Sequence, residues 1–490
     1  MTNQLLEFAE QLSDVREHLA ATPRSIREGK LKRVSGIVLE VEGLPLSIGS
    51  SATIVSQSGD LSFDAECIGF NGGITYLMPL DQVEGIAPGA LVYPASTPVD
   101  YGGGYTTKVA TKPLPIGEAL LGRVVDGLGR PIDGKGDASQ KMTRQSRTIL
   151  NPLDRTPIHE PLDTGIRAVN GLLTVGRGQR VGIFAGSGVG KSVLLGMLAR
   201  NCVADVIVIG LVGERGREVR EFCEETLGPE SFSRAVVVAA PADASPLARS
   251  KGGSYATDVA TWFRDQGKHV VLIVDSLTRY AMALREIGLS LGEAPVARGY
   301  PASVFARLPE LVERVGNGEH PNGSITAFYT VLLEGDDVHD PVGDAARGVL
   351  DGHIFLSREL ADAGHYPAID IEKSISRVMP KVTSREHLLA REVDHRAKNI
   401  MAVIQAIVQL TEADGIANFR KAISGRIGSL ARSHTILADN RWDGAELREL
   451  IEEELAQTEA ANPGKVVKLT KAQQVAACGG PELASCRWAP

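Results

Sequence analysis

The stretch "RVGIFAGSGVGKSVLLGMLAR", residues 180–200, decides the fold of this chain. It reads as an apolar strand, a glycine-rich loop and a helix, which is the order of elements around a phosphate-binding loop. The expected loop consists of Ala185, Gly186, Ser187, Gly188, Val189, Gly190, Lys191 and Ser192. The pattern therefore predicts a nucleotide-binding α/β domain.

The residue types in this loop suit ATP and Mg²⁺. Glycines let backbone N–H groups turn toward phosphate oxygens, and the charge of Lys191 adds to them at the β- and γ-phosphates. The hydroxyl of Ser192 can ligate Mg²⁺. The first position is Ala185, where the strict pattern has glycine. The alternative, an ordinary strand-to-helix turn, does not explain the GKS triplet between a strand and a helix.

Two further apolar runs end in charged residues. "HVVLIVDSLTR" ends in Asp275, a carboxylate at the strand edge where open α/β sheets bind ligands, and we expect it to hold Mg²⁺ through water. "VIVIGLVGERGREV" supplies Glu214, which can polarise the attacking water, and Arg215, which can steady the γ-phosphate. Taken alone, the first run could be an ordinary strand that meets a turn. The second could be a charged turn exposed to solvent.

Composition narrows the class of protein. The chain has 490 residues, of which 43% are hydrophobic, so we expect a globular protein of about two to four domains. The formal net charge of −8 has no basic surplus, so we expect no nucleic acid partner and no direct membrane binding. The 5 cysteines form no C-x-x-C pair, and the amphipathic, acidic start is not a signal peptide, which favours a cytoplasmic protein.

The chain divides into segments of different character. Short β-rich runs punctuated by glycine predict a small barrel, and later Val- and Ile-rich runs alternate with helical stretches, as in a mostly parallel α/β sheet. Beyond these, two apolar stripes, the first running from Leu389 to Ile407, predict a helical hairpin. The expected domains are an N-terminal helix (1–22), the β-barrel (23–97), the nucleotide-binding domain (98–384), the hairpin (385–455) and an unassigned tail (456–490).

From about residue 25 to 380 the sequence resembles the flagellar protein-export ATPases, which are related to type III secretion ATPases and to rotary ATP synthase catalytic subunits. The matching blocks are "LLGRVVDGLGRPIDG", "TGIRAVNGLLTVGRGQRVGIFAGSGVGKS", "GERGREVREF", "DSLTRYAMALREIGLSLGEAPVARGYPASVFARLPELVERVG", "LLEGDDVHDPVGDAARGVLDGHIFLSREL" and "GHYPAIDIEKSISR". A rotary synthase is a weaker match, because its loop usually reads GGAGVGKT.

This resemblance implies a RecA-like ATPase core and a homohexameric ring. It assigns Tyr366 to packing on the adenine base and Arg377 to an arginine finger offered to the neighbouring subunit's nucleotide, roles that suit an aromatic face and a guanidinium. The implied partners are an export gate, a stalk protein, export substrates with their chaperones, and a stator-like regulator that binds the N-terminal helix. The chain would then be peripheral at the membrane only through these partners.

From about residue 386 to 455 the sequence resembles instead the dimerisation and phosphoacceptor region of an HWE-type histidine kinase. His395 is the possible phosphoacceptor. Its companions in the pattern are Arg396, Lys398, Asn399, Arg426, His434 and Trp442. Such a kinase needs a separate ATP-binding domain of well over a hundred residues, and only 35 residues follow the hairpin, so we expect this half to be absent.

Three functions follow from these patterns. The first is an ATPase ring that energises type III export for flagellar assembly. The second is the same enzyme in an injectisome, which shares every motif quoted above. The third is a signalling scaffold whose hairpin dimerises and accepts phosphate.

Overall fold

The computed structural model describes residues 28–95, 114–137, 151–319, 323–333, 340–411, 415–439, 445–446 and 487–488. The predicted N-terminal helix, most of the linker that precedes the ATPase core and nearly all of the predicted tail lie outside these ranges. The chain forms two compact units, Met1–Leu388 and Leu389–Pro490, each described by itself below.

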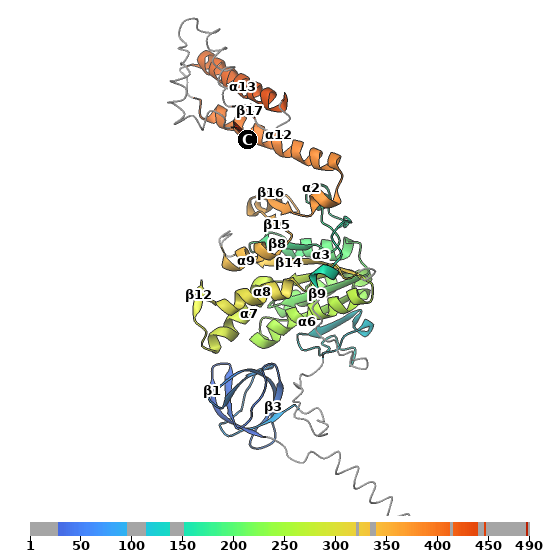
Figure 1. Cartoon of the computed structure of the whole chain (residues 1–490), viewed down its shortest axis with the longest axis vertical. Helices are drawn as coiled ribbons and strands as arrows, with labels where there is room; N and C mark the ends of the chain where they lie inside the picture. Colours follow the sequence, from blue (N-terminus) through green and yellow to red (C-terminus); the bar gives the residue numbers. More distant parts are fainter. Residues whose placement is uncertain are drawn as a thin grey trace, which may run out of the picture. The chain divides into compact units, whose positions relative to one another are not determined.

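Six strands near the start of the chain close into the predicted small barrel (Figure 1). Neighbouring strands pair antiparallel, and alternate side chains point inward, as Ala52 and Ile54 do from β3. The strands are β1 (Gly29–Ser35), β2 (Val38–Glu42), β3 (Ser51–Val55), β4 (Ser62–Asn71), β5 (Ile74–Pro79) and β6 (Leu91–Pro94), in the order β1-β2-β5-β4-β3-β6.

The nucleotide-binding domain is built on one eight-stranded sheet. All neighbouring strands pair parallel except β16, which runs antiparallel to β15 at one edge, so the prediction of a mostly parallel sheet is confirmed. The strands, in order across the sheet, are β16 (Ile369–Ser376), β15 (Gly352–Leu356), β8 (Arg180–Ala185), β14 (Ser324–Leu332), β11 (His269–Asp275), β9 (Val206–Val212), β10 (Ala235–Ala240) and β7 (Arg123–Asp126).

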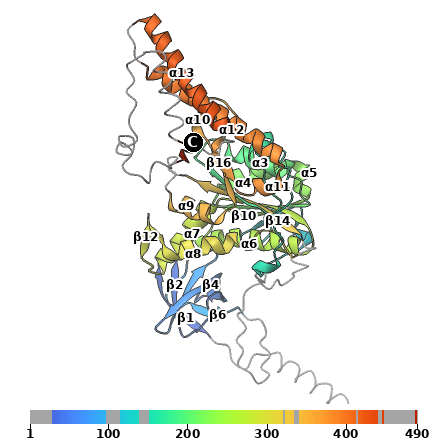
Figure 2. The same cartoon turned by 45° about the horizontal axis from the view of Figure 1, so that its top comes forward.

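Helices cover both faces of this sheet (Figure 2). Every residue of β9 is buried; Val208 and Val212 belong to the core on one face, and Ile207 and Ile209 to the core on the other. This double burial is why the strands read as continuous apolar runs. The first face carries α6 (Pro246–Asp265), α7 (Leu277–Ser290), α8 (Ala302–Val312) and α9 (Pro341–Val349), and the second carries α2 (Arg167–Leu172), α3 (Lys191–Asn201), α4 (Gly216–Glu221), a π-helix (Phe222–Thr226), α5 (Gly228–Ser233) and α10 (Arg358–Asp362).

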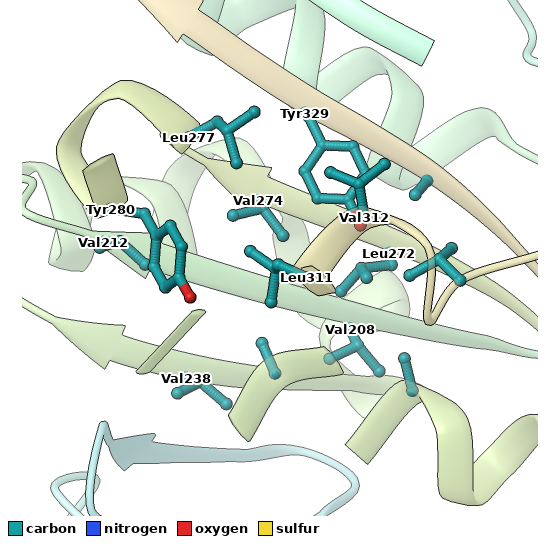
Figure 3. Close-up of a cluster of buried hydrophobic side chains, with 14 of the residues drawn as sticks. Val208, Val212, Val238, Leu272, Val274, Leu277, Tyr280, Leu311, Val312 and Tyr329 are labelled. Atoms are coloured by element: carbon teal, nitrogen blue, oxygen red, sulfur yellow. The ribbon is translucent and has the colours of Figure 1, made fainter. Parts of the chain in front are cut away.

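Aliphatic and aromatic side chains fill the core on the first face. Figure 3 shows Val274 of β11 and Leu311 of α8 among them, with Tyr329 and Tyr280 at its margins. All four side chains are at most 5% exposed. Burial of this extent fixes the strands against the helices, and so fixes where the strand ends lie.

The barrel contacts the nucleotide-binding domain through α6 and the loop before it. Val38 and Met78 of the barrel pack against Leu247 of α6. The hydroxyl of Ser245 donates a hydrogen bond of 2.7 Å to the carbonyl of Leu80, and Lys251 forms an ion pair with Glu66. The remaining short elements of the described residues are 3₁₀ turns (Glu118–Leu120 and Pro152–Asp154), β12 (Pro295–Ala297), β13 (Tyr300–Pro301), α11 (Met379–Val382), β17 (Ala445–Glu446) and β18 (Arg487–Trp488).

The predicted helical hairpin is confirmed as α12 (Arg385–Gln409) and α13 (Ile416–Asp439). Arg426 of α13 donates a hydrogen bond of 2.9 Å to the hydroxyl of Thr411, which follows α12. Ile407 is half-buried, whereas Leu389, at the start of the predicted stripe, is 55% exposed. Among the described residues, no helix combines the length and apolar character needed to cross a membrane.

Candidate active site

The glycine-rich loop joins the buried end of β8 to the first turn of α3. Gly188 and Gly190 adopt φ angles of 79° and 91°, a left-handed conformation that strongly favours glycine. Ala185 is the last residue of β8 and has no such angle, since Arg298 is the only described non-glycine residue with positive φ. The departure from the strict pattern at Ala185 therefore causes no backbone strain. The loop leads into the N-terminus of α3, where free N–H groups and the helix dipole favour an anion.

Three charged side chains converge beside this loop. The Lys191 ammonium donates a hydrogen bond to the Asp275 carboxylate and lies 3.3 Å from Oε1 of Glu214. Their side chains are only 12%, 5% and 13% exposed. Asp275 ends β11 and Glu214 follows β9, two adjacent parallel strands whose carboxyl ends share an edge with the end of β8. The structure thus brings together three residues that the sequence predicts as catalytic or metal-binding.

Burial affects the acid–base properties of this cluster. Desolvation raises the pKa of the Glu214 carboxyl above its ordinary value, and the Lys191 ammonium opposes this rise.

Thr330 is a site residue that sequence reasoning missed. It lies on β14, between β8, which leads into the loop, and β11, which ends in Asp275, and its hydroxyl donates a hydrogen bond of 2.6 Å to Oδ1 of Asp275. It is fully buried and holds the carboxylate in place. The only signal in the sequence is a threonine near the end of a buried strand.

Tyr366 lies at the same edge of the sheet, as its predicted contact with the nucleotide requires. Its side chain is 58% exposed, and a Cβ added at Gly190 would lie 3.3 Å from its Cε1, so the ring adjoins the loop. Arg358 of α10, also missed from the sequence, donates a hydrogen bond of 3.1 Å to the carbonyl of Ser187. Only the packing of α10 against the loop reveals this contact.

Arg215 is not brought into the cluster. Its side chain is 85% exposed and pairs with Glu218 at 3.3 Å. His395 lies within α12, in the second compact unit, and its side chain is outside those that the structure describes.

Arg377 lies near the amino-terminal ends of the parallel strands, whereas the loop lies at their carboxyl-terminal ends. Because β16 runs antiparallel to β15, its start pairs with Leu356 near the loop and its end pairs with Gly352 far from it. The backbone of Arg377 bonds Asp351, which in turn bonds Arg180. Arg180 and Ala185 are the two ends of β8, on the order of 16 Å apart at about 3.3 Å per residue. The backbone of Arg377 therefore lies far from its own subunit's loop.

The residues at the loop fit a nucleotide with Mg²⁺. The Nε atom of Arg279 is buried without a hydrogen-bond partner in the described part of the chain, and its stem packs on Gly213, next to Glu214. A buried, unpaired cationic donor beside the loop suits an anionic ligand. Among the described residues, no three His, Cys, Asp or Glu side chains are grouped in a way that could hold a metal ion.

Comparisons with known proteins agree with this geometry. Residues 165–376 match the family described as ATP synthase alpha/beta family, nucleotide-binding domain, and residues 392–472 match the family described as HWE histidine kinase. The first match agrees with the predicted relation to rotary ATP synthase catalytic subunits, and the second gives weak support, on a short segment, to the predicted resemblance to an HWE-type histidine kinase.

Curated relatives cover most of the chain. A flagellum-specific ATP synthase of Salmonella typhimurium is 57% identical over 390 residues, which are 79% of this chain and 84% of the relative. A type 3 secretion system ATPase of Xanthomonas euvesicatoria is 45% identical over 387 residues, 79% of this chain and 84% of the relative.

A solved structure matches as well. The assembled ATPase EscN from the type III secretion system of enteropathogenic E. coli is 40% identical, with a TM-score of 0.69 over 81% of this chain and 93% of EscN. The β-barrel, the parallel sheet, the phosphate-binding loop and these relatives lead to one conclusion: the chain belongs to the family of flagellum-specific ATP synthases and type 3 secretion system ATPases, and it is an ATP-hydrolysing enzyme.

Proposed function

We propose that this chain hydrolyses ATP with Mg²⁺ as a homohexameric ring and that hydrolysis energises type III protein export for flagellar assembly. The observation that carries the proposal is the separation of Arg377 from its own subunit's loop, where Lys191, Glu214 and Asp275 are gathered. A site that holds the nucleotide in one subunit and takes its arginine from the next is active only after assembly. EscN, 40% identical, has been solved as an assembled ATPase and in complex with its central stalk EscO.

The residues have distinct roles in this proposal. The loop N–H groups and Lys191 hold the β- and γ-phosphates, while Ser192 and Asp275 are the groups that would hold Mg²⁺, with Thr330 keeping Asp275 in place. Bound Mg²⁺ would neutralise phosphate charge. When the Lys191 ammonium pairs with phosphate, Glu214 is released from it and can accept a proton from the attacking water. Tyr366 packs on the adenine base, whereas the exposed Arg215, paired with Glu218, has no place in the site.

Arg377 supplies the last requirement. Its guanidinium stabilises the charge that spreads over the γ-phosphate oxygens of the neighbouring subunit's nucleotide. Such a contribution is worth roughly 10³- to 10⁵-fold in rate. A single subunit should therefore hydrolyse ATP very slowly, and hydrolysis should depend on the position of the neighbour.

Relatives in flagellar systems favour flagellar export over an injectisome. Flagellum-specific ATP synthases of Salmonella typhimurium and Pseudomonas aeruginosa are 57% and 55% identical, against 45% for the type 3 secretion system ATPase of Xanthomonas euvesicatoria. The proposed partners are an export gate, a stalk protein, a stator-like regulator, export substrates and their chaperones. We place the enzyme in the cytoplasm, peripheral at the membrane through these partners.

A second candidate function rests on the match of residues 392–472 to the HWE histidine kinase family. The hairpin of α12 and α13 would then serve a signalling scaffold, with His395 as the phosphate acceptor. Phosphate incorporation at His395 by a partner kinase would distinguish this function from export alone.

The test of the first proposal uses mixed rings. Arg377→Ala subunits keep the loop and Glu214, whereas Glu214→Ala subunits keep Arg377. Each variant alone should be inactive, and mixtures should regain part of the ATPase activity at interfaces where an intact site meets an intact arginine. If cross-linking shows that mixed rings form and no mixture regains activity, the arginine does not act between subunits.

A further inference from the structure

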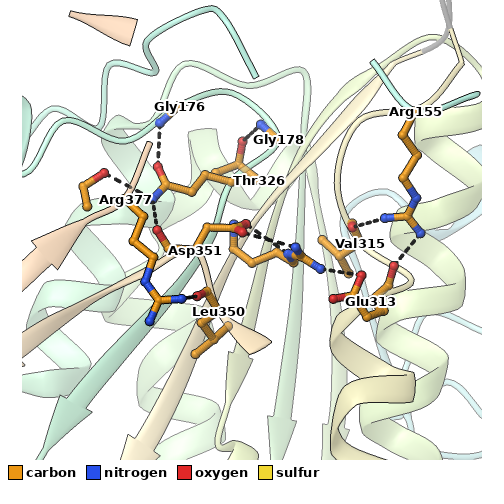
Figure 4. A network of polar contacts seen from close by, with 12 residues as sticks. Arg155, Gly176, Gly178, Glu313, Val315, Thr326, Leu350, Asp351 and Arg377 are labelled. Atoms are coloured by element: carbon orange, nitrogen blue, oxygen red, sulfur yellow. Dashed lines mark hydrogen bonds and ion pairs between the residues drawn. The ribbon is translucent and has the colours of Figure 1, made fainter. Parts of the chain in front are cut away.

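We propose that Asp351, held by Arg180, is a positioning residue that aims Arg377 at the neighbouring subunit's nucleotide. The inference rests on the proposed function, because it assigns Arg377 to a site between subunits. It concerns the ion pair between Arg180 and Asp351, which lies at the amino-terminal ends of the strands, away from the phosphate-binding loop (Figure 4).

One short segment of backbone holds Arg377. Its guanidinium donates hydrogen bonds of 3.3 Å to the carbonyls of Leu350 and Arg347, and its backbone N–H donates one of 3.0 Å to the carbonyl of Asp351. These three acceptors lie at the end of α9 and in the turn before β15. The direction of the guanidinium therefore depends on where that turn lies.

Asp351 ties the turn to β8. Its carboxylate accepts hydrogen bonds of 3.0 and 3.2 Å from the Nε and Nη2 atoms of Arg180, and a third of 3.1 Å from the Arg180 backbone N–H. The backbone N–H of Asp351 donates a hydrogen bond of 2.8 Å to the carbonyl of Arg180. A bidentate arginine–carboxylate pair fixes orientation as well as distance, and the side chains here are only 17% and 25% exposed.

Two further contacts make the turn rigid. Gln179 donates a hydrogen bond of 3.0 Å to the Asp351 carbonyl, the same atom that accepts the Arg377 backbone N–H. Arg180 also forms an ion pair of 2.7 Å with Glu313. Figure 4 shows these contacts as one continuous network from Arg377 to the residues after α8.

The anchor is on the strand that carries the phosphate-binding loop. Arg180 begins β8 and Ala185 ends it, and β8 is bonded to a parallel strand on each side. A movement of the loop along the strand would thus reach the turn that holds Arg377. The geometry links a subunit's own nucleotide site to the arginine that it offers to its neighbour.

The competing explanation is that Arg180 and Asp351 form an ordinary ion pair that only stabilises the fold. The two explanations predict losses of activity in different subunits of a mixed ring. If Asp351 orients Arg377, its loss should lower activity only when the altered subunit donates the arginine. If it only stabilises the fold, its loss should lower activity both in the subunit that donates the arginine and in the subunit that holds the nucleotide. Arg123 and Asp133 supply a matched control: they form a bidentate pair of 2.7 and 3.0 Å, also largely buried, around edge strand β7.

The experiment places Asp351→Asn in either partner of the mixed ring. In the donor arm, Glu214→Ala subunits with or without Asp351→Asn are mixed with Arg377→Ala subunits. In the receiver arm, Asp351→Asn is combined with Arg377→Ala, and the donor is Glu214→Ala alone. Asp133→Asn replaces Asp351→Asn in both arms as the control, and cross-linking checks that mixed rings form.

We expect the kcat recovered in the donor arm to fall roughly 10- to 100-fold, the range that a displacement of about 1 Å of a positioned group can cause. The kcat of the receiver arm and of both control arms should stay within about 2-fold of the reference mixture. KM for ATP should be unchanged, because the orientation of Arg377 does not alter nucleotide binding. Equal losses in both arms, or no loss in the donor arm, would overturn the positioning role and leave the action of Arg377 between subunits intact. A reference mixture that forms mixed rings and recovers no activity would overturn both.

Discussion

The ammonium of Lys191 lies 3.3 Å from Oε1 of Glu214, although the two residues follow different strands of the sheet. The same ammonium also bonds Asp275, so a single cation holds two largely buried carboxylates together. A phosphate that competes for this ammonium would change the surroundings of both carboxylates at once. Binding and catalysis are therefore coupled through one side chain.

Replacing Lys191 with alanine should abolish ATP hydrolysis while leaving the fold intact. Loss of one charged group that stabilises the transition state costs about 100-fold or more in kcat. Steady-state turnover with Mg-ATP measures the effect, and circular dichroism checks the fold. Lys373→Ala is a suitable control, because Lys373 is exposed and pairs with Asp370 on β16. Unchanged turnover in Lys191→Ala would contradict the phosphate-binding role of the loop.

The pH dependence of kcat/KM, which reports ionisations of the free enzyme, should reveal Glu214. Burial raises the pKa of its carboxyl, and a protonated carboxyl cannot take a proton from water. Activity should thus be lost as pH falls through this raised pKa, at a pH above the ordinary glutamate value of 4.5. Glu214→Gln should lower kcat and remove this acidic limb from the residual rate. A limb that persists unchanged in Glu214→Gln must come from another group.

Removing the ring of Tyr366 should weaken nucleotide binding more than it slows the chemical step. Stacking of a base on an aromatic side chain is worth about 1–3 kcal/mol, which corresponds to a rise in KM of roughly 5- to 150-fold for Tyr366→Ala. Tyr366→Phe is the matched control, since it keeps the ring and should keep KM. Equal effects of the two substitutions would show that the hydroxyl, and not the ring, matters.

His269 should make the folded state less stable in mild acid. Burial lowers its pKa to about 4, from an ordinary 6.5, with Arg177 adding to the effect and Asp205 opposing it. Between these values the unfolded chain binds a proton that the folded chain does not. The free energy of unfolding is therefore unaffected by His269 above pH 6.5 and decreases toward pH 4, by about 3 kcal/mol in all.

Denaturant unfolding at pH 7 and pH 5 measures this dependence. His269→Gln should flatten the change between the two pH values relative to the unmodified chain, and the exposed His159→Gln should not. A slope that is the same in all three proteins would assign the acid sensitivity to other groups.

The chain given radiolabelled ATP should not acquire acid-labile phosphate on His395. Phosphate transfer needs an in-line approach to the γ-phosphate, and in the proposed function that phosphate faces water beside Glu214 and the neighbouring subunit's Arg377. Labelling that disappears in His395→Gln but survives Lys191→Ala would show a second ATP site.

Local sequence patterns predicted most of the nucleotide-binding fold. The pattern of the buried strands is strong, because β9 is apolar throughout and β11 is apolar between His269 and Asp275. Edge strands have weaker local signals: β7 is only four residues long, and β16 mixes buried with exposed residues and carries charges. Such strands gain most of their stability from their neighbour in the sheet, which a local pattern does not record.

The sequence by itself determined the phosphate-binding loop and the carboxylates of Glu214 and Asp275, because strand, glycine turn and helix start are local and parallel strands end at a common edge. Only the tertiary structure decided the partners of these groups. Thr330 reaches Asp275 because β14 lies beside β11, and the backbone of Arg377 lies far from the loop because β16 runs antiparallel to its neighbour β15. Strand order and direction depend on packing between segments far apart in the chain, and that packing has no local signature.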